Sequence, residues 1–262
     1  LRSAVPARNY GAPLGGWGTA LSRGQEAAQA WGAPPEAALE YARLIKGFSD
    51  LSPEPERRIH GYCRTLSTLA EAIKRRPYDP QLLISWANLR QVLGSIPCEL
   101  PGADGDYRKA VDLALAQDPT NTQLMIGAGR IAIWDRRRQD AIALFARAVS
   151  LAPSLPDPDL DLILAQIREP ADLKAVIPAR MPQAIQWRRW FEQRRPGVSR
   201  RPEYASVWRE IEIRALDMTW TEFEAGRLPG DVYQRLLTQA VGALASAEAR
   251  QRADQRLAAL LE

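Results

Sequence analysis

Hydrophobic residues recur at three- and four-residue steps along most of the chain, which is the spacing of one face of an α-helix. The first clear pattern begins after Pro34. A second runs from Pro55 to Arg75, where basic residues and Pro77 mark a helix end. Further helical patterns follow almost to the last residue, and no alternation typical of β-strands occurs between them. We therefore predict an all-α protein.

An internal repeat is the most specific pattern in the sequence. Pro119 and Pro153 are 34 residues apart. A packed helical hairpin needs small residues where its helices cross and a large residue in the groove between them. Residues of these kinds precede Pro153 and are Gly129, Ala141, Phe145 and Ala148. The spacing and the residue types together predict repeated helical hairpins.

Residues 122–153 resemble a tetratricopeptide repeat (TPR) without a gap. The unit before it, residues 77–119, resembles the same repeat with an insertion in a proline-rich loop at residues 95–102. The resemblance extends over about residues 65–153. It implies a TPR-like solenoid of stacked helical hairpins.

The pattern divides the chain into three parts. Residues 1–33 are rich in glycine and contain scattered aromatic residues, which predicts an extended or flexible N-terminal arm. Residues 34–153 carry the TPR-like helical repeats. Residues 154–262 form a divergent helical region that ends in one long amphipathic helix, which runs from about Asp231 nearly to Glu262. Such a helix caps the last repeat of a solenoid or mediates dimerisation.

In tetratricopeptide proteins, the first helices of successive repeats line a concave groove that holds a peptide or a helix of the partner. The resemblance places two sets of residues in such a groove. They are Gln81, Ile84, Asn88, Gln91 and Val92 in one repeat, and Gln123, Ile126, Arg130, Ile133 and Trp134 in the next. This mixed polar and apolar set implies a protein partner. The protein's own arm or C-terminal helix is the alternative occupant.

The formal net charge is only +4, but its distribution is uneven. Seven arginines and a single acid, Glu192, lie between Arg180 and Arg201. Such a block favours binding to RNA, a membrane surface or an acidic protein, and a solvated helix face is the plainer interpretation. The predicted basic patch comprises Arg180, Arg188, Arg189, Arg194 and Arg195.

Aromatic residues interleave with arginines at residues 187–191, a pattern that can stack nucleic-acid bases. On a helix, however, Trp187 shares a face with Trp190 or Phe191, as in an amphipathic helix that buries large side chains. We therefore expect these aromatic residues in the core and do not expect nucleic-acid binding.

The counts of chemically reactive residues restrict the function. The chain has one histidine and two cysteines, and His60, Cys63 and Cys98 lack a fourth ligand for a zinc site. The sequence has no nucleophilic-serine or phosphate-loop motif, so we expect no enzyme activity, metal or cofactor. Cys63 and Cys98 form a disulfide in an oxidising compartment or remain two thiols.

These observations predict a non-catalytic scaffold or adaptor that binds another protein within a larger assembly. The cysteine pair and the absence of an initiator methionine favour a bacterial periplasmic or extracytoplasmic protein, and a cytoplasmic location stays open. No apolar stretch is long enough to form a transmembrane segment. The alternatives are an anionic-ligand module that uses residues 180–201, and a subunit that associates with copies of itself. The sequence does not identify the partner.

Overall fold

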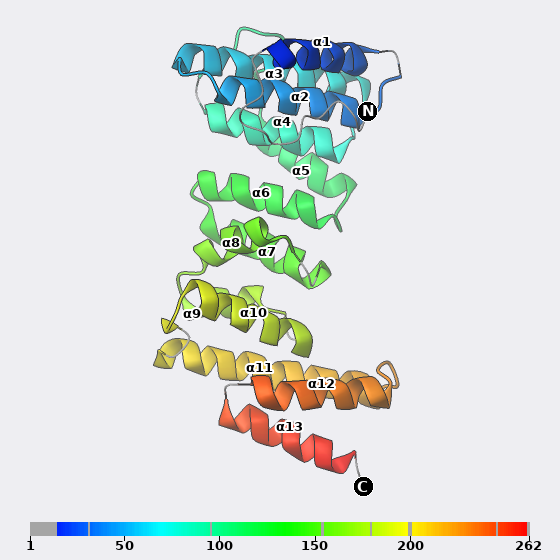
Figure 1. Ribbon diagram of the computed structural model, residues 1–262, viewed down its shortest axis with the longest axis vertical. Helices are drawn as coiled ribbons and strands as arrows, with labels where there is room; N and C mark the ends of the chain where they lie inside the picture. The colour runs from blue at the N-terminus through cyan, green and yellow to red at the C-terminus, as the bar shows by residue number, and fades with distance from the viewer. Residues whose placement is uncertain are drawn as a thin grey trace. The chain divides into compact units, whose positions relative to one another are not determined.

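The structure is a computed structural model, and it describes residues 15–30, 32–94, 96–152, 155–178, 180–198, 201–244 and 246–260. Its regular elements in these residues are all α-helices, so the all-α prediction is confirmed (Figure 1). No helix in this part of the chain is long and apolar enough to cross a membrane. The chain divides into two compact units, unit 1 (Leu1–Asp135) and unit 2 (Arg136–Glu262).

In the described residues, unit 1 contains helices that, except for α1, begin at a proline or a capping side chain. They are α1 (Gly15–Gln29), α2 (Pro35–Asp50), α3 (Pro55–Arg75), α4 (Pro80–Leu93), α5 (Tyr107–Gln117) and α6 (Thr122–Trp134). Prolines open α2, α3 and α4, where the missing N–H costs no hydrogen bond. Asp79 caps α4 by accepting the N–H of Leu82 at 3.0 Å, and Asn121 caps α6 in the same way.

The helices of unit 1 pack in sequence, α2 against α3 and α4 against α5, and α4 also packs against α6 (Figure 1). The approach of α4 to α6 is close, because a Cβ atom at Gly127 would lie 3.0 Å from Cγ1 of Ile84. Ile84 and Ile126 are therefore buried in the core. Their predicted placement as groove-lining residues is wrong, because both side chains are buried.

The predicted N-terminal arm is partly helical. Gly15–Gln29 forms α1, so the prediction of an extended or flexible arm is wrong over this stretch. Glycine disfavours a helix by about 1 kcal/mol, but here tertiary contacts outweigh that preference. Helix α1 packs on α2, with the ring of Tyr41 close to Gly24, and Arg75 of α3 donates a hydrogen bond to the carbonyl of Ala28. The rest of the predicted arm, apart from residues 30, 32 and 33, lies outside the described residues.

The inserted loop between α4 and α5 is held at several points. A disulfide joins Cys98 of the loop to Cys63 of α3. Nε1 of Trp86 donates a hydrogen bond to the carbonyl of Gly102 at 3.1 Å. Gly102 has a φ of 72° and approaches Ala70 so closely that a Cβ atom would lie 2.6 Å away, so glycine is required there. The loop is therefore a fixed part of unit 1.

Unit 2 is also helical. Its helices are α7 (Arg138–Leu151), α8 (Asp157–Gln166), α9 (Pro170–Val176), α10 (Met181–Arg194), α11 (Pro202–Glu224), α12 (Gly230–Ala243) and α13 (Ala247–Ala259). Helix α11 contacts α9, α10, α12 and α13. Trp187 and Phe191 are fully buried, and Phe191 packs edge-on against Trp208 with ring centroids 5.8 Å apart. The interpretation of Trp187 and Phe191 as core residues is confirmed, whereas Trp190 is half-buried.

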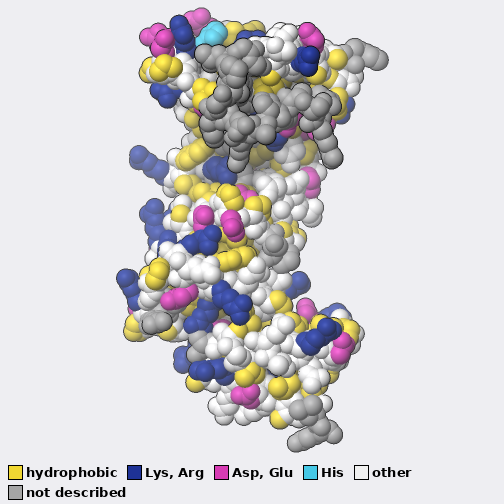
Figure 2. All heavy atoms as spheres, viewed as in Figure 1, with side chains coloured by type: hydrophobic (Ala, Val, Ile, Leu, Met, Phe, Trp, Pro, Cys, Tyr) yellow, Lys and Arg dark blue, Asp and Glu magenta, His cyan; other side chains and the backbone are white. Residues whose placement is uncertain are grey.

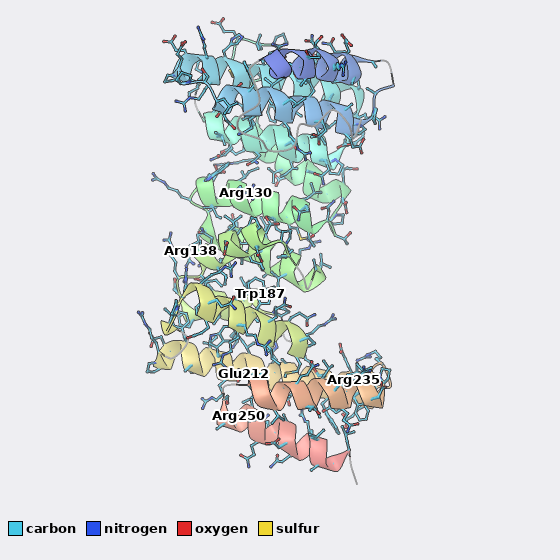
Figure 3. The ribbon with its side chains drawn as sticks, viewed as in Figure 1. Arg130, Arg138, Trp187, Glu212, Arg235 and Arg250 are labelled. Carbon is cyan, nitrogen blue, oxygen red and sulfur yellow. A yellow bond between two sulfur atoms is a disulfide. The ribbon has the colours of Figure 1, made fainter. Side chains whose placement is uncertain are left out.

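Arg138 fixes the short helix α9 to α7 (Figure 3). Its guanidinium donates to Asp172 at 2.5 Å and to the carbonyl of Gln166 at 3.1 Å. Burial acts to raise the pKa of Asp172. The charge and hydrogen bond of Arg138, with two backbone N–H groups, outweigh it and hold the pKa below its usual value. The buried carboxylate is thus fully compensated.

The C-terminal region contains two helices where one was predicted. The prediction of one long capping helix from about residue 231 is wrong, because α12 ends at Ala243 and a separate helix, α13, begins at Ala247. Leu244 is extended and buried, and Ser246 caps α13 by accepting the N–H of Ala249 at 3.3 Å. The chain turns there, and α11, α12 and α13 run back and forth (Figure 1).

The repeat that resembles a TPR most closely is divided between the units. Helix α6 ends unit 1 and α7 begins unit 2, whereas Pro153 lies outside the described residues. The stacking of this hairpin in a solenoid therefore stays a prediction.

Candidate functional site

A concave pocket opens on unit 1 between α2, α3, α4 and α6. It has a volume of about 430 Å³, and we call it the unit 1 groove. Four of the residues that the TPR resemblance placed in a groove line it together: Asn88, Val92, Arg130 and Trp134. Figure 3 labels Arg130 on α6. These four side chains come from the first helices of the two predicted repeats.

The other predicted groove residues do not line this pocket. Ile84 and Ile126 are in the core, as described above. Four further residues lie elsewhere on α4 and α6: Gln81, Gln91, Gln123 and Ile133. The sequence register thus identified the helices that form the groove but only part of the helix face.

Two large apolar side chains of the unit 1 groove are open to solvent. Val92 is 50% exposed and Trp134 is 43% exposed. Exposed aromatic side chains beside aliphatic ones are typical anchors for a bound partner. This part of the groove is therefore available to an apolar side chain from another molecule.

The charged residues that line the unit 1 groove are all basic. Arg43 and Lys46 of α2 and Arg130 of α6 line it, and no acidic side chain does so among the described residues. Lys46 pairs with Asp50, which also accepts a hydrogen bond from Tyr62. That hydrogen bond, together with burial, raises the pKa of the Tyr62 hydroxyl, so it stays neutral. The lining residues carry three positive charges, and two of them, Arg43 and Lys46, pair with Glu40 and Asp50 outside the pocket.

The residues of α2 and α3 in this groove escaped the sequence analysis. Arg43, Lys46 and Tyr62 precede residue 65, where the TPR resemblance begins. Leu39, Arg43 and Lys46 follow one another at four- and three-residue steps, which places them on one helix face. This spacing was the sequence feature that could have indicated that α2 also lines the groove.

Beside the groove, Asp135 connects α4, α5 and α6. Its carboxylate accepts hydrogen bonds from the Tyr107 hydroxyl at 2.7 Å, Nε of Arg108 at 3.1 Å and Nε2 of Gln91 at 3.5 Å. Burial acts to raise the pKa of Asp135, but the Tyr107 hydrogen bond and the Arg108 charge hold it below its usual value. The network fixes the end of α6 that carries Trp134.

Most arginines of the predicted basic patch form ion pairs or hydrogen bonds with other residues of unit 2. Arg188 forms an ion pair with Glu212, and Arg194 pairs with Asp161. Arg195 donates to two backbone carbonyls, including that of Leu164 at 2.7 Å. Basic, acidic and hydrophobic side chains are interspersed on the face drawn in Figure 2. Arg180 and Arg189 are exposed, and neither forms an ion pair with another described residue.

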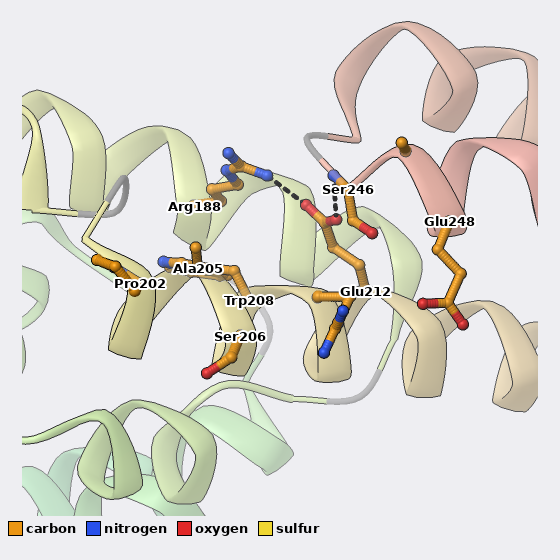
Figure 4. Close-up of a pocket in the computed structure, with 10 residues that line it drawn as sticks. Arg188, Pro202, Ala205, Ser206, Trp208, Glu212, Ser246 and Glu248 are labelled. Carbon is orange, nitrogen blue, oxygen red and sulfur yellow. Dashed lines mark hydrogen bonds and ion pairs between the residues drawn. The ribbon is translucent and has the colours of Figure 1, made fainter.

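A second pocket, of about 560 Å³, surrounds Glu212 between α10, α11 and the start of α13 (Figure 4). Glu212 is only 2% exposed, and its other oxygen accepts the backbone N–H of Ser246 at 3.0 Å. The Arg188 guanidinium lies 5.9 Å from the ring centroid of Trp208. The charge of Glu212 is thus compensated by contacts with Arg188 and Ser246.

The described residues contain no group of three or more His, Cys, Asp or Glu side chains that could hold a metal ion. Cys63 is in the disulfide and is not available as a ligand beside His60. No family model matches the chain, and comparison with curated proteins and with solved structures finds no similar protein.

Proposed function

We propose that this protein is a non-catalytic scaffold or adaptor with TPR-like repeats, and that the unit 1 groove binds a segment of a partner protein. The observation that supports the proposal most strongly is the composition of this groove. Exposed Val92 and Trp134 lie beside the basic side chains of Arg43, Lys46 and Arg130. A segment with an apolar anchor and acidic residues complements this lining in both polarity and charge.

The neighbouring structure supports a preformed site. The Asp135 network holds the end of α6, and the disulfide fixes the inserted loop against α3. A rigid groove loses little conformational entropy when it binds a peptide. The disulfide also supports an extracytoplasmic setting, because such bonds persist in oxidising compartments.

The test uses photo-crosslinking in cells. A photoreactive amino acid is introduced at Val92 in the full chain, and at Tyr78 as a control position that is exposed but outside the groove. We expect one dominant crosslinked protein from position 92 and not from position 78. The same products from both positions, or none from position 92, would refute the groove model.

Two substitutions of opposite charge at Val92 then test whether the partner segment is acidic. Val92→Glu adds an acid to the basic lining and should greatly reduce crosslinking from position 134, whereas Val92→Lys should preserve it. Both substitutions are at an exposed site, so neither should unfold the protein. The double variant Arg130→Ala/Trp134→Ala, crosslinked from position 92, should also lose the partner. Equal capture by the glutamate and lysine variants would contradict an acidic partner.

A further inference from the structure

A smaller pocket in unit 2 has a composition that no structural role explains. It lies between the end of α7, α9, α10 and α11 and has a volume of about 330 Å³, at the lower end of the range for small-molecule sites. We call it the Arg180 pocket. Its apolar wall includes Leu151 and Met218, which are 46% and 40% exposed, together with Val149 and Ile177.

The charged side chains of the Arg180 pocket are Lys174, Arg180 and Arg214, and the described residues supply no acid to the lining. Lys174 pairs with Glu210, which lies outside the pocket. The described residues form no ion pair or side-chain hydrogen bond with Arg180 or Arg214. Two guanidinium groups are therefore available to an anion.

Gln183 adds a polar feature to the same pocket. It lines the pocket from α10, and its Oε1 atom is buried without a hydrogen-bond partner among the described residues. A buried acceptor without a donor is destabilising, so a ligand that supplies an N–H or O–H group there would restore the missing hydrogen bond.

We infer that the Arg180 pocket binds a small amphipathic carboxylate, with the carboxylate on Arg180 and Arg214 and the apolar part against Leu151 and Met218. Guanidinium groups form short, charge-assisted hydrogen bonds with carboxylates. The apolar wall excludes a purely polar anion as the preferred ligand, because the exposed Leu151 and Met218 would stay in water. This site lies in unit 2 and is independent of the groove proposed above.

Calorimetric titration of the full chain with octanoate tests the inference. We expect saturable binding that weakens roughly tenfold or more in Arg180→Ala/Arg214→Ala and for the neutral analogue 1-octanol. Arg189→Ala removes an exposed arginine of α10 that does not line the pocket, and it should bind octanoate as the parent protein does. Absence of saturable binding, equal affinity for 1-octanol, or an equal loss in Arg189→Ala would overturn the inference.

A second pair of variants tests the placement of the ligand's carboxylate by an independent route, a competing charge at Met218. Met218→Glu places a carboxylate beside the guanidinium groups and should prevent octanoate binding, whereas Met218→Gln should weaken it only slightly. N-acetyl-leucine distinguishes the source of the carboxylate. If N-acetyl-leucine binds more tightly than octanoate and this advantage is lost in Gln183→Leu, the carboxylate belongs to a peptide C-terminus. If octanoate binds more tightly, the carboxylate belongs to a free acid. Equal binding of octanoate by Met218→Glu and Met218→Gln would contradict the placement.

Discussion

The carboxylate of Asp135 joins three helices of unit 1, and the carboxylate of Asp172 joins α9 to α7 in unit 2. Both carboxylates are buried, and both have pKa values below the usual range because their donors outweigh the effect of burial. Such residues are difficult to recognise in a sequence. Asp135 follows Trp134 directly, but its partners, Tyr107 and Arg108, are 27 or more residues away in the chain.

Asp135→Asn should lower the free energy of unfolding by about 1–2 kcal/mol at pH 7, because the charge-assisted contacts are lost while the side chain keeps its shape. The folded-state pKa of Asp135 is lowered, so its stabilising contribution is complete above about pH 4 and is lost as the pH falls through the folded-state value. Urea denaturation at several pH values checks this. The difference in the free energy of unfolding between Asp135→Asn and the parent protein should become smaller below about pH 4.

The exposed Asp112 on α5 provides a matched control. Asp112→Asn should change the free energy of unfolding by less than about 0.5 kcal/mol. An equal effect of the two substitutions, or a difference for Asp135→Asn that does not depend on pH, would contradict the assigned network.

At the scale of the helix, the sequence pattern predicted the start of α2 and both ends of α3, because proline and basic end signals act within a few positions. Helix α1 and the break before α13 were missed. Both depend on side chains from other helices, Tyr41 and Arg75 for α1 and Glu212 for α13, and local patterns do not contain that information.

Glu212→Ala should loosen α13 selectively. The substitution removes the carboxylate that accepts the Ser246 N–H and pairs with Arg188. The Arg188 side chain is only partly buried, so it can still be solvated by water. Hydrogen–deuterium exchange should show faster exchange over Ala247–Ala259, with a loss of protection of roughly 2 kcal/mol. Glu210→Ala, on the same helix α11, should leave the exchange of α13 unchanged. If both variants behave alike, Glu212 does not hold α13.

For the molecule as a whole, the sequence predicted the all-α class but not the division into two units at Asp135. The TPR resemblance crosses that boundary, because a repeat is recognised from local residue types whereas a unit is defined by contacts between distant helices. The groove illustrates the same limit. The resemblance predicted Asn88, Val92, Arg130 and Trp134 of its lining but not Ser85 and Leu89 of α4 or the residues from α2.

The disulfide should stabilise one unit only. Cys63 and Cys98 are separated by 35 residues within unit 1, and closing a loop of this length stabilises a fold by about 4 kcal/mol in the chain-entropy account. In the double variant Cys63→Ser/Cys98→Ser of the full chain, hydrogen exchange should accelerate in α3, α4 and α5. Exchange in α11 and α13 should stay as it is in the parent protein. Equal acceleration throughout would show that the two units unfold together.

The position of this bridge also determines how the chain would carry mechanical force. Tension applied to the two ends would pass from Cys63 directly to Cys98, so that residues 64–97 would bear none of it. These residues include α4, which forms the middle wall of the groove, and stretching the oxidised chain would release about 120 Å less length than stretching the reduced one. In the oxidised chain, helix α4 would therefore carry no tension along its backbone.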